Sequence, residues 1–277
     1  MAAATLELTP ADLPDEPAVM ARAGGENFPV ALRLLGRRQR RALRAVYGFA
    51  RLADELGDEY DGDRLAALAW LERELDRAYA GTATAPLLVA LQGVLAERAL
   101  PREPFVRLIE ANRLDQRAFR YETWQELQGY CELSANPVGE LVLEIFDMRT
   151  PERVALSDAV CTGLQLTEHL QDLGEDLRRG RSYVPQEDLD RHESLPAAVR
   201  FELARVRTLL WAGAPLAASI PAWRPKLAIA AFAAGGLAAL EQIERAGCEV
   251  LDGVAPAGSL QRARWLGLVL RRSRERS

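Results

Sequence analysis

Apolar residues recur along most of the chain at spacings of three and four, which is typical of helices with one buried face. The clearest example is segment 38–58, whose apolar or small positions are Leu43, Val46, Ala50, Ala53 and Gly57. No stretch alternates polar and apolar residues for long, and β-branched residues do not cluster, so strand signals are nearly absent. The pattern predicts an all-α protein.

Capping and turn signals divide this pattern into successive helices. Thr123 and Glu126 form a capping box, and Pro151 follows Thr150 at another helix start. Pro137 should bend or break the helix that Thr123 opens, because proline lacks the backbone N–H that a helix needs. The remaining helices are expected at 64–79, 86–100, 104–121, 151–180, 195–213 and 225–246, followed by an Arg-rich final helix.

No internal repeat and no Pro-, Gly- or Ser-rich linker interrupts these helices. We therefore expect one domain over residues 21–277. Residues 1–20 precede it as a disordered or loosely attached arm, because this stretch is acidic and holds three prolines by Pro17. Its composition fits neither a signal peptide nor an amphipathic anchor.

The longest apolar run, 227–240, is shorter than the ~20 residues that a membrane-spanning helix needs. It predicts a buried helix. Alanine and glycine dominate the run, so the helix either packs tightly against its neighbours or lines a hollow interior, and tight packing is favoured.

The 277 residues include 35 basic and 40 acidic ones, which gives a formal net charge of −5. This balance argues against general binding to nucleic acid, and any phosphate site must be local. Cys131, Cys161 and Cys248 are widely spaced, which predicts reduced core cysteines, no zinc site and a cytoplasmic protein.

Two acidic clusters, 54–59 and 172–176, are the informative chemical feature. Residues four apart share a helix face, so Asp54 lies with Asp58, and Asp172 lies with Asp176. Such like-charged pairs cost an isolated helix a few tenths of a kcal/mol each. Either they lie on solvated surfaces, or they hold a cation such as Mg²⁺, which prefers oxygen ligands.

Basic and tyrosine side chains adjoin both acidic clusters. Tyr47 and Arg51 precede the first cluster, and Arg181 and Tyr183 follow the second. Arginines and tyrosine hydroxyls next to a bound cation suit a diphosphate. Surface ion pairs are the alternative role for each arginine taken alone.

The two clusters belong to longer segments that resemble signatures of the squalene and phytoene synthase family. Segment 47–59 reads YGFARLADELGDE, and segment 164–185 reads LQLTEHLQDLGEDLRRGRSYVP. Order, spacing and the Arg-Gly-Arg-x-Tyr-x-Pro tail all agree, and the resemblance covers about residues 20–270. Segments 26–31, 130–139 and 161–166 resemble the hydroxysqualene synthase branch of the family.

The resemblance implies an isoprenoid-synthase helical bundle around a central hydrophobic cavity. It also implies Mg²⁺-dependent ionisation of presqualene diphosphate, rearrangement of the cation and capture of water to give hydroxysqualene, in hopanoid and squalene biosynthesis. Such an enzyme is a carbon–oxygen lyase, and it works with pathway partners that make its substrate and reduce its product.

The resemblance also assigns roles to individual residues. Asp54, Asp58, Asp172 and Asp176 would hold Mg²⁺ and, through it, the diphosphate. The expected contacts to the diphosphate or its pocket are Tyr47, Arg51, Arg181 and Tyr183. The expected lining of the tunnel for the prenyl chains is Phe28, Tyr130, Ala135 and Gly139.

Three positions depart from the usual family pattern. Glu168 stands where many members have asparagine, so its role as a metal ligand stays open. The neighbouring His169 is expected to be a hydrogen-bonded structural residue. Asn136 either orients the trapping water or satisfies backbone groups freed by Pro137, and the second role is favoured. No base for the water is evident.

Two other functions remain as alternatives. One is a squalene or phytoene synthase, a prenyltransferase that condenses two farnesyl or geranylgeranyl diphosphates head to head. The other is a non-catalytic family member that binds a partner. The apolar substrate further suggests transient contact with the inner membrane face through the tail at 271–276, which holds four arginines and one glutamate.

Overall fold

The computed structural model describes Leu8, Leu13 and residues 35–275. Contacts divide the chain into two compact units. The first comprises Met1–Arg117 with Leu141–Asp147, and the second comprises Ala118–Glu140 with Met148–Ser277. The expected arm at 1–20 lies almost wholly outside the described residues, and one domain over 21–277 stays a prediction.

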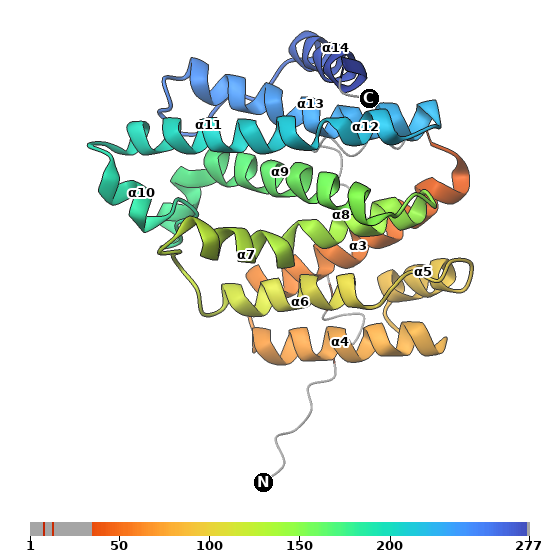
Figure 1. The fold of residues 1–277 in the computed structure, drawn as a ribbon. Coiled ribbons are helices and arrows are strands. Elements are labelled where there is room, and N and C mark those ends of the chain that lie inside the picture. The colour runs from red at the N-terminus through yellow and green to blue at the C-terminus, as the bar shows by residue number, and fades with distance from the viewer. Residues whose placement is uncertain (1–7, 9–12, 14–34, 276–277) are drawn as a thin grey trace. The chain divides into compact units, whose positions relative to one another are not determined.

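The described residues form helices and no strand, which confirms the all-α prediction (Figure 1). A single isolated bridge pairs Arg120 with Ser182 within this part of the chain. The helices are α3 (Arg37–Asp58), α4 (Arg64–Ala80), α5 (Pro86–Leu95), α6 (Glu103–Asp115), α7 (Trp124–Ser134), α8 (Asn136–Ile145), α9 (Pro151–Arg178), α10 (Gln186–Arg191), α11 (Leu195–Gly213), α12 (Pro215–Ser219), α13 (Trp223–Arg245) and α14 (Ser259–Glu275).

In the first unit, α3 packs against α4, α5 and α6. Its apolar stripe enters a core in which Phe49 meets Phe105 edge to face, with ring centroids 4.9 Å apart. The predicted bounds of α4 are confirmed by its caps. Asp63 accepts a hydrogen bond from Ala66 N, and Gly81 ends the helix with a φ of 79°.

In the second unit, α9 lies between α7 and α11, and α13 packs on α9, α11, α12 and α14. Thr123 and Glu126 form the predicted capping box at α7. The predicted break at Pro137 is confirmed, because α7 ends at Ser134 and α8 begins at Asn136.

Helix α13 contains the long apolar run and is mostly buried, as predicted. A Cβ added at Gly236 would lie 2.9 Å from Leu164 Cδ2 and 3.0 Å from Leu210 Cδ1, so helices approach closely there. This contact supports tight packing at that point of the run. By length and composition alone α13 could cross a membrane, but 61% of its most apolar stretch is buried inside the protein, as in a core helix.

The predicted end, at residue 121, of the helix expected at 104–121 is wrong. α6 ends at Asp115, and the backbone beyond it pairs with the segment that follows α9. Ser182 N donates to Phe119 O at 2.8 Å, and Gln186 N donates to Tyr121 O at 2.9 Å. These long-range hydrogen bonds satisfy backbone groups that a longer helix would have used.

The glycine of the second acidic cluster allows a close backbone contact. A Cβ at Gly174 would lie 2.6 Å from the carbonyl carbon of Leu251, in the connection between α13 and α14. Backbone atoms of that connection cannot yield as a flexible side chain can. Gly174 is therefore needed for packing.

We expect Gly174→Ala to lower the free energy of unfolding by about 1–3 kcal/mol, because overpacking outweighs the gain in helix propensity. Gly93→Ala on α5 is the matched control, since a Cβ there meets nothing within 4 Å. It should leave stability unchanged or raise it by up to about 1 kcal/mol. Urea denaturation measures both, and equal effects of the two substitutions would contradict the packing role.

Candidate functional site

The first acidic cluster lies at the C-terminal end of α3. Asp54 and Asp58 share one face of this helix, and Arg51 lies one turn earlier. The Arg51 guanidinium is 3.7 Å from Glu55 Oε1 and 3.7 Å from Glu59 Oε1. Both separations exceed a hydrogen-bond distance, so Arg51 forms ion pairs with these two carboxylates that lack a hydrogen bond.

Asn112 of α6 reaches the carboxylate of Asp54. Its Nδ2 donates to Asp54 Oδ1 at 3.2 Å and to Leu108 O at 3.1 Å. A Cβ at Gly57 would lie 3.0 Å from Asn112 Cγ, so the glycine of the first cluster makes room for this amide. α6 thus fixes the orientation of one carboxylate on α3.

The pKa of Asp54 is raised to about 7, chiefly by desolvation. The hydrogen bond from Asn112 and the charge of Arg51 oppose this shift, whereas the charges of Asp58 and Asp115 add to it. Asp54 is nevertheless exposed by accessible area. Solvent therefore reaches the carboxylate, but the protein atoms around it exclude much of its hydration shell. This loss of hydration makes ionisation of Asp54 costly although the residue lies at the surface.

The second acidic cluster lies at the C-terminal end of α9. Glu168 and Asp172 are exposed, whereas Asp176 is partly buried. Asp176 Oδ2 is buried and accepts no hydrogen bond from the described residues, and His169 Nδ1 lies 3.9 Å away. An acceptor oxygen left without a hydrogen bond is available to a cation.

The pKa of Asp172 is also raised. Desolvation is the largest cause, followed by the charges of Asp176 and Glu175, and His169 and Arg179 oppose it. Each acidic cluster therefore holds negative charge that the surrounding protein does not fully compensate. Charge of this kind is typical of functional sites.

Four rings pack together beside the second cluster. His169 lies on Tyr183 with ring centroids 3.6 Å apart and planes 9° from parallel. The Tyr183 centroid is 5.6 Å from that of Tyr130 and 5.9 Å from that of Tyr121. We call His169, Tyr121, Tyr130 and Tyr183 the aromatic cluster.

His169 has the hydrogen-bonded position expected of it. Gln165 Nε2 lies 3.0 Å from His169 Nε2. The amide and the ring are therefore within hydrogen-bond distance, and His169 Nδ1 faces Asp176 Oδ2 at 3.9 Å. The ring thus links the acidic and aromatic clusters.

The segment around Pro137 packs tightly against α9. Ala135 is buried, and a Cβ at Gly139 would lie 2.6 Å from Cys161 Sγ. Asn136 Oδ1 accepts a hydrogen bond from Thr162 Oγ1 at 3.0 Å. This contact tethers α8 to α9, and both sequence-based interpretations of Asn136 stay predictions.

The other predicted site residues fall in three places. Tyr47 is partly buried on α3, in the first unit. Arg181 follows α9 in the second unit, where its N–H donates to Asp176 O at 2.8 Å. Phe28 lies outside the described residues. The structure brings Arg51, Asp54 and Asp58 together in one unit, and Tyr130, His169, Asp176 and Tyr183 together in the other.

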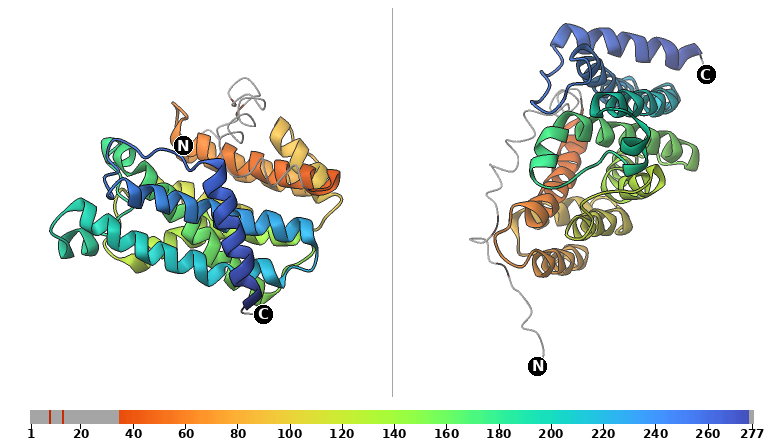
Figure 2. Two further views of the ribbon diagram at one scale, coloured as in Figure 1. Left: turned by 90° about the horizontal axis from the view of Figure 1, so that it is seen from above. Right: turned by 90° about the vertical axis from the view of Figure 1, so that its left-hand side faces the viewer.

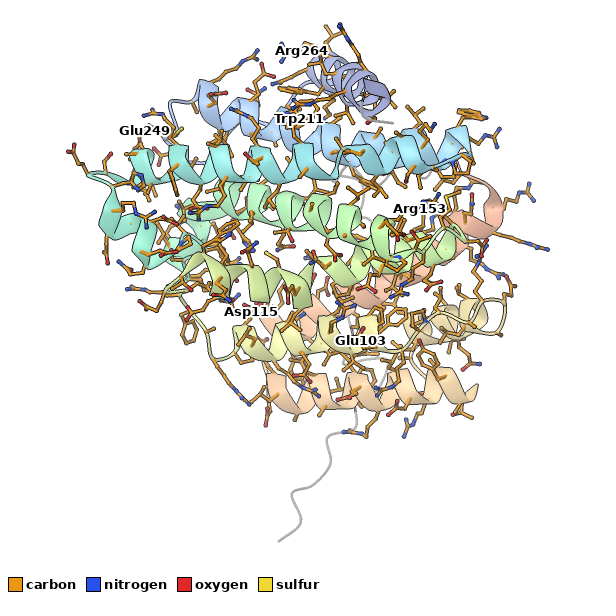
Figure 3. All side chains as sticks on the ribbon, viewed as in Figure 1. Glu103, Asp115, Arg153, Trp211, Glu249 and Arg264 are labelled. Carbon is orange, nitrogen blue, oxygen red and sulfur yellow. The ribbon has the colours of Figure 1, made fainter. Side chains whose placement is uncertain are left out.

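Sequence reasoning missed Asn112, Asp115 and Tyr121. Asp115 is a buried acid at the end of α6, labelled in Figure 3. Asn112 and Asp115 lie three residues apart within a predicted helix, so a polar pair on one helix face was the available signal. Tyr121 gave no such signal, because its place depends on the backbone pairing with residues 182–186.

The raised pKa of Asp54 predicts a pH-dependent stability. The folded state keeps the Asp54 proton up to about pH 7, whereas the unfolded chain loses it near pH 4. Ionisation of this group therefore lowers stability as pH rises from about 4 to about 7. Asp54→Asn removes this cost and retains an oxygen that can accept from Asn112.

We expect Asp54→Asn to be more stable than the native protein at pH 8 in EDTA, with a smaller difference at pH 4.5. Chemical denaturation at both pH values measures this. Asp61→Asn, at an exposed position beyond α3, controls for the loss of one surface charge. A variant that is equally or less stable than the native protein at pH 8 would overturn the assignment of a costly carboxylate.

Comparisons with known proteins place these features in a family. The sequence profile described as Squalene/phytoene synthase matches residues 21–266. The hydroxysqualene synthase of Rhodopseudomonas palustris is 39% identical over 226 residues, covering 76% of each chain. The hydroxysqualene synthase of Zymomonas mobilis is 36% identical over 197 residues, covering 66% of each chain.

Solved structures are similar along most of the chain. The crystal structure of the squalene synthase HpnC from Alicyclobacillus acidocaldarius is 40% identical, with a TM-score of 0.78, and the match covers 86% of this chain and 98% of that one. A dehydrosqualene synthase in complex with ligand has a TM-score of 0.82 at 23% identity, covering 94% and 95%, and this likeness concerns the fold. The chain belongs to the squalene/phytoene synthase family, whose enzymes act on prenyl diphosphates.

Proposed function

We propose that this protein is a hydroxysqualene synthase. It ionises presqualene diphosphate, rearranges the resulting cation and captures water, releasing hydroxysqualene and diphosphate. The observation that carries the proposal is that the two acidic family motifs lie on helices in a chain 39% and 36% identical to proteins named hydroxysqualene synthase.

The carboxylates of the two motifs suit Mg²⁺. Each motif offers two aspartates on one helix face, and Asp176 Oδ2 is buried without a hydrogen bond from the described residues. The described residues contain no group of three or more His, Cys, Asp or Glu arranged to hold a metal. Mg²⁺ is commonly held by one or two carboxylates, with waters and substrate phosphates completing its octahedron, so a pair is sufficient.

In this proposal Asp54 and Asp58 hold Mg²⁺ at one motif, and Asp172 and Asp176 hold it at the other. Glu168 is exposed next to the second pair and stays a candidate ligand. Bound Mg²⁺ would neutralise the negative charge that develops on the departing diphosphate.

Arginine and tyrosine side chains supply the protein's own contacts to the diphosphate. Arg51 forms ion pairs with Glu55 and Glu59 that lack a hydrogen bond, and it can offer its donor fork to phosphate oxygens. The backbone hydrogen bond from Arg181 to Asp176 O keeps Arg181 beside the second acidic cluster. In the proposal, Tyr47 and Tyr183 complete these contacts.

The aromatic cluster suits the cation that remains when the diphosphate leaves. The face of Tyr130 carries the partial negative charge of an aromatic π-system, which attracts a cation, whereas one face of Tyr183 is covered by His169. Tyr130 is buried, so the attraction acts with little screening by water. Phe28, Ala135 and Gly139 are the proposed lining for the prenyl chains.

The proposed reaction replaces the C–O bond to the diphosphate by a C–O bond to water. The C–O bond to the diphosphate breaks, and the diphosphate leaves with the electron pair. An oxygen lone pair of water then forms a new C–O bond to the rearranged cation, and the resulting oxonium releases one proton to the departed diphosphate or to solvent. No oxidant or reductant takes part, so the product is an alcohol.

A second candidate is a squalene synthase that condenses two farnesyl diphosphates. It is favoured by the 40% identity to a solved protein named squalene synthase. The two functions differ in substrate. The second consumes farnesyl diphosphate alone, whereas the first requires presqualene diphosphate.

Incubation of the purified protein with Mg²⁺ and each substrate in turn tests the proposal. We expect hydroxysqualene from presqualene diphosphate and no turnover of farnesyl diphosphate, measured by mass spectrometry of extracted lipids. Squalene formed from farnesyl diphosphate would establish the second candidate. Failure to convert any prenyl diphosphate would favour a non-catalytic binding protein.

Variants sharpen this assay. Asp54→Asn and Asp172→Asn should each lower kcat by about 100-fold or more, because each loses one charged ligand at a motif. Glu152→Gln, at an exposed carboxylate in the first turn of α9, is the matched control and should keep native activity. Native activity in both aspartate variants would contradict the assigned roles.

A further inference from the structure

Helix α14 is attached to the second unit by one face. It lies across α13 and also contacts α12 (Figure 2). Val269 is fully buried, and Ser273 Oγ donates to Ala214 O at 2.8 Å. Trp265 Nε1 donates to Glu241 Oε2 at 2.7 Å. These contacts fix which side of α14 faces outward.

The outward side of α14 carries leucine and arginine together. This side consists of five exposed residues. Their spacings of three and four residues along α14, with one adjacent pair, place them on one face of the helix. They are Leu260, Arg264, Gly267, Leu268 and Arg271. We call them the α14 face, and Figure 3 labels Arg264 on it.

Both leucines of the α14 face are unusually exposed. Leu260 has 89% of its surface accessible and Leu268 has 41%. Leu260 is the most exposed of the large apolar residues in the described part of the chain, with Trp223 next at 62%. Moving a leucine that is this exposed from water into apolar surroundings lowers its free energy.

The charge of α14 is opposite to that of the whole chain. Residues 259–275 contain five arginines and one glutamate, which gives +4, whereas the chain carries −5. Arg264 Nη2 lies 2.5 Å from Glu241 Oε2, which partly compensates its charge, and the Arg272 guanidinium lies 4.4 Å from the ring centroid of Trp211. The helix that presents the leucines thus carries an excess of arginine over acidic residues.

We propose that the α14 face docks the protein on an anionic phospholipid bilayer. Leu260 and Leu268 enter the boundary between headgroups and acyl chains, and the arginines contact lipid phosphates. The long arginine side chains can lie along the surface while their charged ends stay hydrated. The proposed docking surface runs along α14 from Leu260 to Arg271, and so differs from the tail at 271–276. The proposal holds whichever reaction the protein catalyses.

A protein partner suits this face less well. A helix of 17 residues is about 25 Å long and about 10 Å wide, so its outward side covers about 250 Å². Stable protein interfaces bury about 800 Å² on each partner. Binding to a bilayer requires no such minimum buried area, because burial of leucine side chains and attraction of arginines to anionic lipids act together.

Flotation with vesicles tests the proposal. The full chain is mixed with vesicles of phosphatidylcholine alone or with 30% phosphatidylglycerol, at 0.1 M and 0.5 M NaCl. We expect the native protein to float with the anionic vesicles at 0.1 M salt, and less with neutral vesicles or at 0.5 M salt. The double substitution Leu260→Ser with Leu268→Ser should lower the bound fraction by about tenfold.

Controls distinguish docking from misfolding and self-association. Leu65→Ser on α4, where the leucine is 40% exposed, is the matched control and should bind as the native protein does. Circular dichroism and size-exclusion chromatography check folding and oligomeric state. The proposal is overturned if the native protein does not bind anionic vesicles or if the double variant binds them equally well. It is also overturned if size-exclusion chromatography shows that the double substitution converts a dimer into monomers and leaves vesicle binding unchanged.

Discussion

Carboxylates that lie close together and are partly removed from water are the constraint on which the candidate site depends. Asp54 and Asp58 on α3, and Asp172 and Asp176 on α9, place like charges one turn apart. Desolvation and these charges raise the pKa of Asp54 and Asp172, and one oxygen of Asp176 is buried without a hydrogen bond from the described chain. Each pair carries a cost that a bound cation would remove, which gives the pairs a functional meaning.

The scaffold supports these charges by close packing around glycine. Gly57 admits the amide of Asn112, which donates to Asp54, and Gly174 admits the backbone at Leu251. The glycines inside the two acidic motifs are therefore explained by contacts that a side chain would block. Both contacts are made by protein atoms, so packing is sufficient to require both glycines.

The all-α fold and the sharing of one helix face by each pair of aspartates were predictable from the sequence, because both follow from the spacing of nearby residues. Capping at Asp63 and Thr123 was equally local and was confirmed. Contacts between distant segments were not predictable in this way. The early end of α6 depends on backbone hydrogen bonds to residues 182–186, and Asn136 bonds to Thr162, 26 residues away. Side-chain types at these positions do not reveal their partners.

The central claim is that both acidic motifs hold divalent cations for a diphosphate. Anomalous diffraction from crystals grown with Mn²⁺ and inorganic diphosphate tests it most directly, because Mn²⁺ can take the place of Mg²⁺ and is visible at its absorption edge. The account predicts anomalous peaks about 2.1 Å from carboxylate oxygens of Asp54 or Asp58 and of Asp172 or Asp176. Peaks at one motif only, or at neither, would contradict it.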